Sequence, residues 1–371
     1  MPVSPDIRDA LASILEPQLV RPLGELGFLG AVDDSGGDLR VELVLPFLNW
    51  PNLPTLTERI LAIQPAAQVV TRSMNDDERL ALRHFLRGAM AAPAGPGHHD
   101  HGGDPSPKFL DKIAKTRVLG ISSGKGGVGK SSVTINLAIA LAQLGFDVGV
   151  LDADVYGFSL PKMLGASHDP IVLGDTVIPT LVHGVRCLSM GYFVNDEQPV
   201  IWRGPMLHKA IEQLVTEAWW DEPDFLLIDM PPGTGDVALT LSEVVPRIEM
   251  YVVTTPQAAA QRVAQRSAYA ARKLKLAVRG VIENMSWFTG DDGTRYEIFG
   301  AGGGESLASD LGIAFLGQVP LDPRLREGGD VGQPVVVELP ESEVAVAFRG
   351  LAEKIVAQGR ARVYRQELKL V

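Results

Sequence analysis

The segment 124–131 reads Gly124-Lys125-Gly126-Gly127-Val128-Gly129-Lys130-Ser131, and it decides the fold of the chain. It matches the pattern G-x-x-x-x-G-K-[ST], in which glycines let successive main-chain N–H groups close around phosphate oxygens. Arg117 to Ile121 are typical of a buried strand that enters this loop, and Ser131 to Leu144 are typical of a helix that leaves it. The positive end of that helix faces the same place. The sequence therefore predicts a phosphate-binding loop between a strand and a helix.

This loop predicts a site for ATP and Mg²⁺. We expect Lys130 to reach the terminal phosphates and the Ser131 hydroxyl to sit on the bridging Mg²⁺. The residues expected to contact the nucleotide in this loop are Gly124, Lys125, Gly126, Gly127, Val128, Gly129, Lys130, Ser131 and Ser132.

Carboxylates follow two other predicted strands. Val148 to Leu151 end in Asp152-Ala153-Asp154, and Phe225 to Ile228 end in Asp229. Ligands of a doubly wound sheet bind at the carboxyl ends of its strands. We therefore expect Asp229 to hold Mg²⁺ through water and Asp154 to orient or deprotonate the attacking water. The alternative for each aspartate is that it caps a following turn or helix.

The composition excludes several classes of protein. The chain has 371 residues, 46% of them hydrophobic and 21% charged, which is enough to bury a large core. Its formal net charge of −11 disfavours a nonspecific nucleic-acid binder. Met1 to Asp6 lack the charged start and apolar run of a leader, and we expect a cytoplasmic protein without membrane or nucleic-acid partners. Cys187 is the only cysteine, so one chain builds neither a disulfide nor a thiolate-rich metal site.

Three segments organise the chain. Residues 1–90 alternate short helical and strand patterns, for example a helix over Asp6 to Glu16, and predict a small α+β domain. Residues 91–112 are rich in Pro, Gly and His and predict a flexible linker; its His98, His99, Asp100 and His101 either bind a metal or remain solvated. Residues 113–371 alternate buried strands and helices and predict an α/β domain with a doubly wound, mostly parallel sheet.

Lys125 adds a second lysine to the loop, and with it the segment resembles the signature of deviant Walker A ATPases. Members of that group dimerise with two ATP molecules between the subunits, and their early lysine crosses to the partner's ATP. The resemblance implies a homodimer in which Lys125, Lys130 and Asp154 are the catalytic residues of a slow ATP hydrolysis.

Further runs resemble the Mrp (ApbC) family of iron–sulfur cluster carriers, and residues 1–90 resemble the MIP18-like domain that precedes the ATPase in many members. The runs are Leu151-Asp152-Ala153-Asp154-Val155-Tyr156-Gly157, Trp202-Arg203-Gly204-Pro205-Met206, Asp229 to Asp236, Val281-Ile282-Glu283-Asn284-Met285-Ser286, Ile298-Phe299-Gly300 and Gly317-Gln318-Val319-Pro320-Leu321-Asp322. The resemblance implies that Asn284 binds the adenine, flanked by Pro320 and Asp322. It also implies a role in assembling or transferring iron–sulfur clusters, with scaffold or apoprotein partners.

The chain departs from this family where cluster ligands are expected. Members usually have Cys-x-x-Cys after the Glu-Asn-Met-Ser run, whereas this chain reads Trp287-Phe288-Thr289-Gly290-Asp291-Asp292-Gly293-Thr294, which is typical of a surface hairpin turn. A cysteine of the N-terminal domain is replaced in Asn49-Trp50-Pro51. Cys187 lies in a predicted strand, Val185 to Met190, and we expect it to be buried. A cluster would need ligands from another molecule.

The alternative function is an ATP-dependent positioning switch like MinD or ParA. A MinD-like protein would need a C-terminal amphipathic membrane helix, but residues 360–365 offer little apolar surface. A ParA-like protein would need a basic DNA-binding face, which the acidic balance of the chain disfavours.

Overall fold

This computed structural model describes residues 5–34, 39–86, 114–155, 157–193, 204–233, 235–245 and 247–361. The described chain divides into two compact units. One contains the residues up to 86 together with 171–181, and the other contains residues 114–170 and those from 182 onward. The predicted linker 91–112, with its histidines, lies outside the described residues, as do Trp202 and Arg203. The domain boundaries at 90 and 113 therefore stay a prediction.

The first unit has an α+β architecture. Its three-stranded sheet has the order β3-β4-β5, with β3 antiparallel and β5 parallel to β4. A two-stranded pair, β1 and β2, lies before it in the sequence. The elements are α1 (Pro5–Ala12), β1 (Leu15–Glu16), β2 (Arg21–Pro22), α2 (Leu23–Leu26), β3 (Leu29–Asp33), β4 (Arg40–Leu45), α3 (Leu53–Ile63), β5 (Gln68–Ser73) and α4 (Asp76–Leu86).

The first helix is shorter than the predicted Asp6 to Glu16, because it ends at Ala12. The carboxylate of Glu16 is completely buried and accepts hydrogen bonds from Trp50 Nε1 and Asn52 Nδ2, each at 2.9 Å. A buried carboxylate must be hydrogen-bonded. These distant donors hold Glu16 in strand β1, and tertiary contacts thus override the helical pattern.

The second unit is built on an eight-stranded sheet with the order β10-β11-β7-β12-β6-β13-β14-β17. The pairs from β11 to β17 are parallel, which confirms the predicted mostly parallel sheet. Its strands are β6 (Arg117–Ser123), β7 (Val148–Asp152), β10 (Thr180–Val182), β11 (Val185–Ser189), β12 (Phe225–Asp229), β13 (Glu249–Thr254), β14 (Ala277–Glu283) and β17 (Ala314–Gln318).

The second unit also has one hairpin outside the large sheet, and several helices surround that sheet. This hairpin is β15 (Phe288–Thr289) with β16 (Arg295–Tyr296), whereas the hairpin of β8 (Ile171–Leu173) with β9 (Thr176–Ile178) belongs to the first unit. The helices are α5 (Lys130–Gln143), α6 (Leu160–Leu164), α7 (Gly204–Thr216), α8 (Asp236–Val244), α9 (Ala258–Lys273), α10 (Gly303–Leu311), α11 (Pro323–Val331), α12 (Val335–Glu338) and α13 (Glu343–Ala357). None of the helices that the structure describes has both the length and the apolar character needed to cross a membrane.

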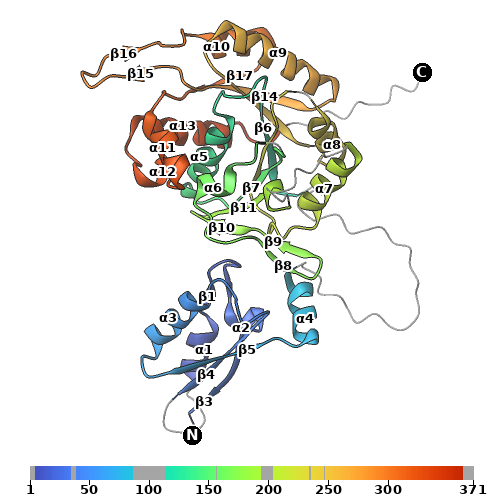
Figure 1. Cartoon of the computed structure of the whole chain (residues 1–371), viewed down its shortest axis with the longest axis vertical. Helices are drawn as coiled ribbons and strands as arrows, with labels where there is room; N and C mark the ends of the chain where they lie inside the picture. The colour runs from blue at the N-terminus through green and yellow to red at the C-terminus, as the bar shows by residue number, and fades with distance from the viewer. Residues whose placement is uncertain are drawn as a thin grey trace. The chain divides into compact units, whose positions relative to one another are not determined.

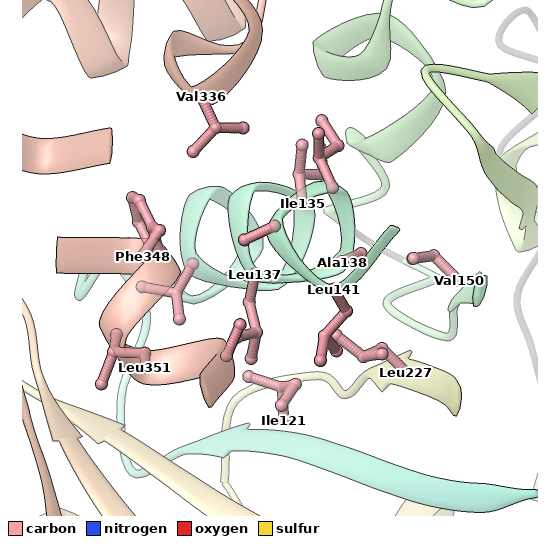
Figure 2. Close-up of a cluster of buried hydrophobic side chains, with 14 of the residues drawn as sticks. Ile121, Ile135, Leu137, Ala138, Leu141, Val150, Leu227, Val336, Phe348 and Leu351 are labelled. Carbon is pink, nitrogen blue, oxygen red and sulfur yellow. The ribbon is translucent and has the colours of Figure 1, made fainter. Parts of the chain in front are cut away.

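Helices cover both faces of the large sheet (Figure 1). On one face, α5 is largely buried: Leu137 and Leu141 pack with Ile121 and Leu227 of the sheet and with Phe348 of α13 (Figure 2). On the other face, the apolar residues of α9 and α10 form a separate cluster with β13 and β14. Burial on both faces explains the continuous hydrophobic strands and confirms the doubly wound fold.

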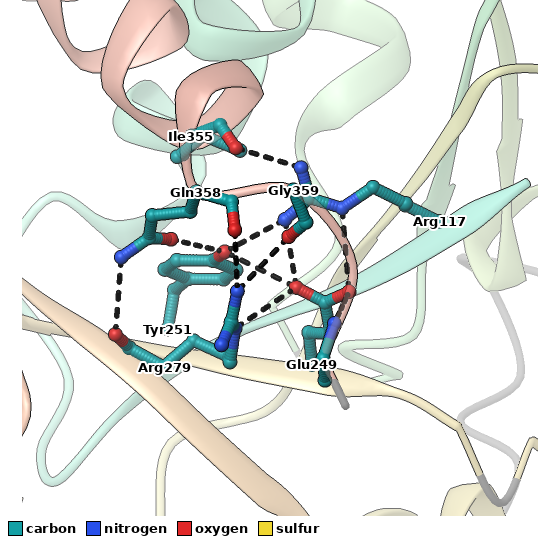
Figure 3. Close-up of polar contacts among 8 residues, drawn as sticks. Arg117, Glu249, Tyr251, Arg279, Ile355, Gln358 and Gly359 are labelled. Carbon is teal, nitrogen blue, oxygen red and sulfur yellow. Dashed lines mark hydrogen bonds and ion pairs between the residues drawn. The ribbon is translucent and has the colours of Figure 1, made fainter. Parts of the chain in front are cut away.

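The amino-terminal edge of the sheet is fastened by a buried ionic network (Figure 3). Glu249, at the start of β13, accepts from Arg117 at 2.7 Å and from Arg279 at 3.3 Å. Arg117 also donates to Ile355 O, and the Tyr251 hydroxyl donates to the side chain of Gln358 at 2.9 Å. The pKa of Tyr251 is raised to about 12, mainly by burial and to a lesser extent by the charge of Glu249. The network ties three strands to the end of α13.

Candidate functional site

The loop 124–129 joins β6 to α5 at the carboxyl edge of the sheet. Gly127 and Gly129 have φ angles of +79° and +77°, a region that favours glycine. At Gly129 a Cβ atom would lie 2.3 Å from Asn284 Nδ2, which donates to the main-chain oxygen of Val128 at 2.9 Å. Glycine at position 129 therefore satisfies both the backbone conformation and the close approach of Asn284.

Three donors converge on the carboxylate of Asp229 at the end of β12. Oδ2 accepts from Lys130 Nζ at 2.6 Å and from Ser131 Oγ at 2.7 Å, and Oδ1 accepts from Thr134 Oγ1 at 2.7 Å. Asp229 is 1% exposed and Lys130 is 7% exposed. We call these four residues the Asp229 cluster. It places an ammonium group, a carboxylate and two hydroxyls together at the start of α5, where the helix dipole favours anions.

A second carboxylate lies beside this cluster on the neighbouring strand. Asp152 ends β7 and is paired in register with Asp229 of β12. The pKa of Asp152 is raised to about 6, mainly by burial and to a lesser extent by the charge of Asp229. Asp152 accepts from the main-chain N–H groups of Asp154, Ser159 and Leu160. It thus closes the loop that carries Asp154.

Asp154 itself is half-buried in that loop. Its carboxylate accepts from the main-chain N–H of Gly157 at 3.1 Å. This is the turn-capping contact that sequence reasoning held open as an alternative.

Asn284 lies between the phosphate-binding loop and the end of β17. The main-chain N–H of Ser286 donates to Val319 O at 3.0 Å, and that of Leu321 donates to Trp287 O at 2.7 Å. These bonds bring the segment of Pro320 alongside the one that carries Asn284. Asn284 is almost completely buried, and among the described residues its Oδ1 atom has no hydrogen-bond partner. An unpaired buried acceptor is costly unless a ligand satisfies it.

The remaining predicted site residues have other contacts. Lys125 Nζ lies 3.4 Å from Gln257 Oε1, at the start of α9. Asp322 caps α11, and its carboxylate pairs with Arg324 at 2.6 Å. Gly126 and Gly127 are exposed. Within the part of the chain that the structure describes, no hydrogen bond joins Lys125, Asp154 or Asp322 to the Asp229 cluster.

Sequence reasoning missed three residues that shape this site: Thr134, Asp152 and Gln257. Thr134 was visible as a hydroxyl one helical turn beyond Lys130, on the same face of α5. Asp152 was noticed only as a neighbour of Asp154. The role of Gln257 depends on how far α9 stands from the loop, which no sequence pattern reports.

The residues present fit a magnesium-bound nucleotide. The Asp229 cluster offers the carboxylate and hydroxyl oxygens that Mg²⁺ prefers, next to a lysine for phosphate. The unpaired Oδ1 of Asn284 offers an acceptor to an exocyclic amine such as that of adenine.

The residues present do not fit an iron–sulfur cluster. Cys187 in β11 is 0% exposed, and burial, together with the charge of Asp152, raises the pKa of its thiol. Such a thiol is a poor metal ligand, because thiolates bind metals. Among the described residues, no group of three or more His, Cys, Asp and Glu side chains is arranged to hold a metal ion.

At the position where the family resemblance implies Cys-x-x-Cys, this chain forms the β15–β16 hairpin that the sequence predicts. Asp292 accepts from Thr294 within the turn. Glu343 accepts from Trp287 Nε1, Thr289 Oγ1 and Arg295, which fixes the base of the hairpin on α13. Side-chain hydrogen bonds and the ion pair of Arg295 with Glu343 thus hold the hairpin in place.

Comparison with known proteins gives the family. The model of the family described as "NUBPL iron-transfer P-loop NTPase" matches residues 114–356. The iron–sulfur cluster carrier protein of Synechocystis sp. is 45% identical over 361 residues, which cover 94% of this chain and 97% of that protein. The corresponding protein of Mycobacterium tuberculosis is 39% identical over 367 residues, covering 95% and 93%, and that of Escherichia coli is 38% identical over 355 residues, covering 95% and 91%.

Solved structures share the fold of the second unit. A nucleotide-binding protein from Archaeoglobus fulgidus in complex with ADP superposes with a TM-score of 0.54 at 33% identity, covering 62% of this chain and 90% of that one. The septum site-determining protein MinD of Pyrococcus horikoshii, complexed with Mg-ADP, gives 0.53 at 28% identity, covering 67% and 100%. With its P-loop, its parallel sheet and its full-length relatives, the chain belongs to the Mrp/ApbC family of iron–sulfur cluster carrier proteins, a branch of the P-loop NTPases.

Proposed function

We propose that this protein is an ATPase that promotes the assembly or transfer of iron–sulfur clusters without supplying cluster ligands of its own. The observation that carries the nucleotide part is the Asp229 cluster, where Lys130 and Ser131 share one carboxylate oxygen at 2.6 and 2.7 Å. The names of the relatives support the second part. The solved relatives that hold ADP and Mg-ADP support the choice of ligand.

In this proposal the donors of the Asp229 cluster change partners when nucleotide binds. Lys130 leaves Asp229 for the terminal phosphates, and the Ser131 hydroxyl turns to the metal. When bound, Mg²⁺ would supply positive charge that stabilises the phosphates. The Ser131 hydroxyl and, through water, Asp229 would hold this ion, and the amide of Asn284 would hold the adenine between the loop and the segment of Pro320 and Asp322.

Hydrolysis requires an attacking water next to the γ-phosphate. We assign Asp154 to orient that water and to accept its proton as the new P–O bond forms and the bond to ADP breaks. Asp152 supports this role, because its carboxylate accepts hydrogen bonds from the main chain at Asp154 and at Ser159 and Leu160. These bonds fix the loop that carries Asp154.

The proposal that the protein acts as a homodimer rests on Lys125. One ammonium group, that of Lys130, already serves the phosphates in the same chain, and Lys125 points to Gln257 instead. We propose that Lys125 leaves Gln257 and reaches the nucleotide of a second copy, where it stabilises the charge of the transition state.

The cluster part of the proposal assigns the thiolates to other molecules. With its single cysteine sealed in β11, the chain would act in the cytoplasm on a scaffold or apoprotein that brings its own ligands. Membership of the carrier family favours this function over the MinD-like positioning switch, which shares the fold.

Two measurements test this function. Anaerobic reconstitution with iron and sulfide alone is expected to give no stoichiometric cluster absorbance. Transfer from a thiolate-ligated donor protein to an apoprotein, followed by circular dichroism, is expected to accelerate when the chain and MgATP are both present, and to lose this acceleration with Lys130→Ala. If the transfer rate is the same with and without the chain, the proposed role is wrong.

A further inference from the structure

Thr134 is the third donor to Asp229, and it uses the oxygen that the other two donors leave free. Its Oγ1 lies 2.7 Å from Oδ1, whereas Lys130 and Ser131 both contact Oδ2. Thr134 is 0% exposed and Asp229 is 1% exposed. The hydroxyl and the carboxylate therefore meet away from bulk water, where a charge-assisted hydrogen bond is strong.

The single hydroxyl hydrogen of Thr134 belongs to this carboxylate. Oγ1 also lies 3.0 Å from the main-chain oxygen of Lys130, within the same helix. That oxygen is a neutral acceptor one helical turn back in α5, where the main-chain N–H of Thr134 can serve it. The carboxylate is charged, accepts only and lies closer. Thr134 thus donates to Asp229.

Nucleotide binding would affect the three hydrogen-bond donors to Asp229 differently. A phosphate competes for Lys130, and a metal ion competes for Ser131, so both contacts to Oδ2 are exchangeable. Thr134 follows the loop by one helical turn and keeps its contact to Oδ1. We propose that Thr134 is a positioning residue that holds Asp229 in place, with Oδ2 directed to the metal's water shell, once Lys130 and Ser131 have turned to the nucleotide. This inference rests on the proposed function.

The test compares Thr134→Val, which keeps the shape of the side chain but removes the hydroxyl, with Thr134→Ser, which keeps the hydroxyl. Mn²⁺ replaces Mg²⁺ as the probe, and its binding to the ADP-loaded full chain is followed by electron paramagnetic resonance. We expect Thr134→Val to weaken Mn²⁺ binding by about tenfold, as is typical when an outer-shell partner is lost. Thr134→Ser should stay within about twofold of the wild type, and ADP binding in EDTA should be equal in all three proteins.

The outcomes separate this inference from the proposed function. If the wild-type protein shows no ADP-dependent Mn²⁺ binding, the proposed function fails. If the wild type binds Mn²⁺ and Thr134→Val binds it equally well, only the role of Thr134 is overturned. If Thr134→Val weakens ADP binding in EDTA to the same extent, the hydroxyl serves the fold of the loop and the inference is wrong. Should Thr134→Val not fold, Thr134→Cys places a weak donor of similar size there, and unchanged Mn²⁺ affinity in that variant contradicts the proposal.

Discussion

The Nζ atom of Lys125 lies 3.4 Å from Oε1 of Gln257, in the same chain. This contact holds Lys125 away from the Asp229 cluster, so removing Lys125 should not disturb nucleotide binding. We expect Lys125→Ala to bind ATP with unchanged affinity but to hydrolyse it about 10³-fold more slowly, because a cation supplied from a second subunit has an effect of that size. Single-turnover hydrolysis and equilibrium binding of a fluorescent ATP analogue measure the two quantities. Lys273→Ala, an exposed lysine on α9, is the control, and an unchanged rate for Lys125→Ala would refute the assignment.

Replacement of Lys130 should act on both binding and stability. We expect Lys130→Ala to lower ATP affinity by about 100-fold or more, since it removes a charged hydrogen-bond donor to phosphate. It also leaves the Asp229 carboxylate buried without its ion-pair partner, which should lower the free energy of unfolding by about 3 kcal/mol. Calorimetric titration and urea unfolding check the two effects. Lys115→Ala, at a half-exposed ion pair with Asp224, should change neither, and equal behaviour of both variants would contradict the prediction.

Asp154→Asn should separate binding from hydrolysis in a different way. The amide retains the hydrogen bond to the N–H of Gly157 but does not accept a proton from water. We expect unchanged affinity for MgATP and a hydrolysis rate at least about 100-fold lower. Asp310→Asn, at an exposed position of α10, should hydrolyse ATP normally. Normal turnover in Asp154→Asn would leave the carboxylate with its turn-capping role alone.

Glu249→Gln should destabilise the fold without touching the site. The change leaves the guanidinium group of Arg117 buried next to a neutral amide, and we expect a loss of about 3 kcal/mol in the free energy of unfolding. ATP affinity should not change, because the network lies at the opposite edge of the sheet from the phosphate-binding loop. Urea unfolding and nucleotide titration test both statements, with the exposed Glu305→Gln as control. A loss of ATP affinity in the folded variant would show that the two edges are coupled.

Cys187 should be unreactive in the native protein. Burial raises the pKa of its thiol, so the thiolate that attacks disulfide reagents is scarce even at pH 8. We expect negligible modification by an aromatic disulfide reagent in buffer and one thiol per chain after unfolding in guanidinium chloride. Rapid stoichiometric modification of the native protein would mean that β11 opens readily.

Sequence patterns predicted the parts of the fold and the site that depend on local order. The loop from Gly124 to Ser131 follows from glycine spacing, and Asp229 follows from its place at a strand end. Thr134 and Gln257 could not be assigned in the same way, because their roles depend on distances set by packing between α5, β12 and α9. The prediction that the first helix reaches Glu16 was wrong for a similar reason. Glu16 is held by hydrogen bonds from Trp50 and Asn52, which lie more than thirty residues away in the sequence.

The burial of Cys187 also protects its thiol from oxidation. Peroxide attacks exposed thiolates first, and this chain presents none, since its one sulfur outside methionine is enclosed within the sheet. Its native surface therefore offers no thiol for a disulfide cross-link or for oxidation to sulfenic acid. In the proposed function, thiol oxidation during oxidative stress would therefore fall on the molecules that contribute the thiolates and not on this chain.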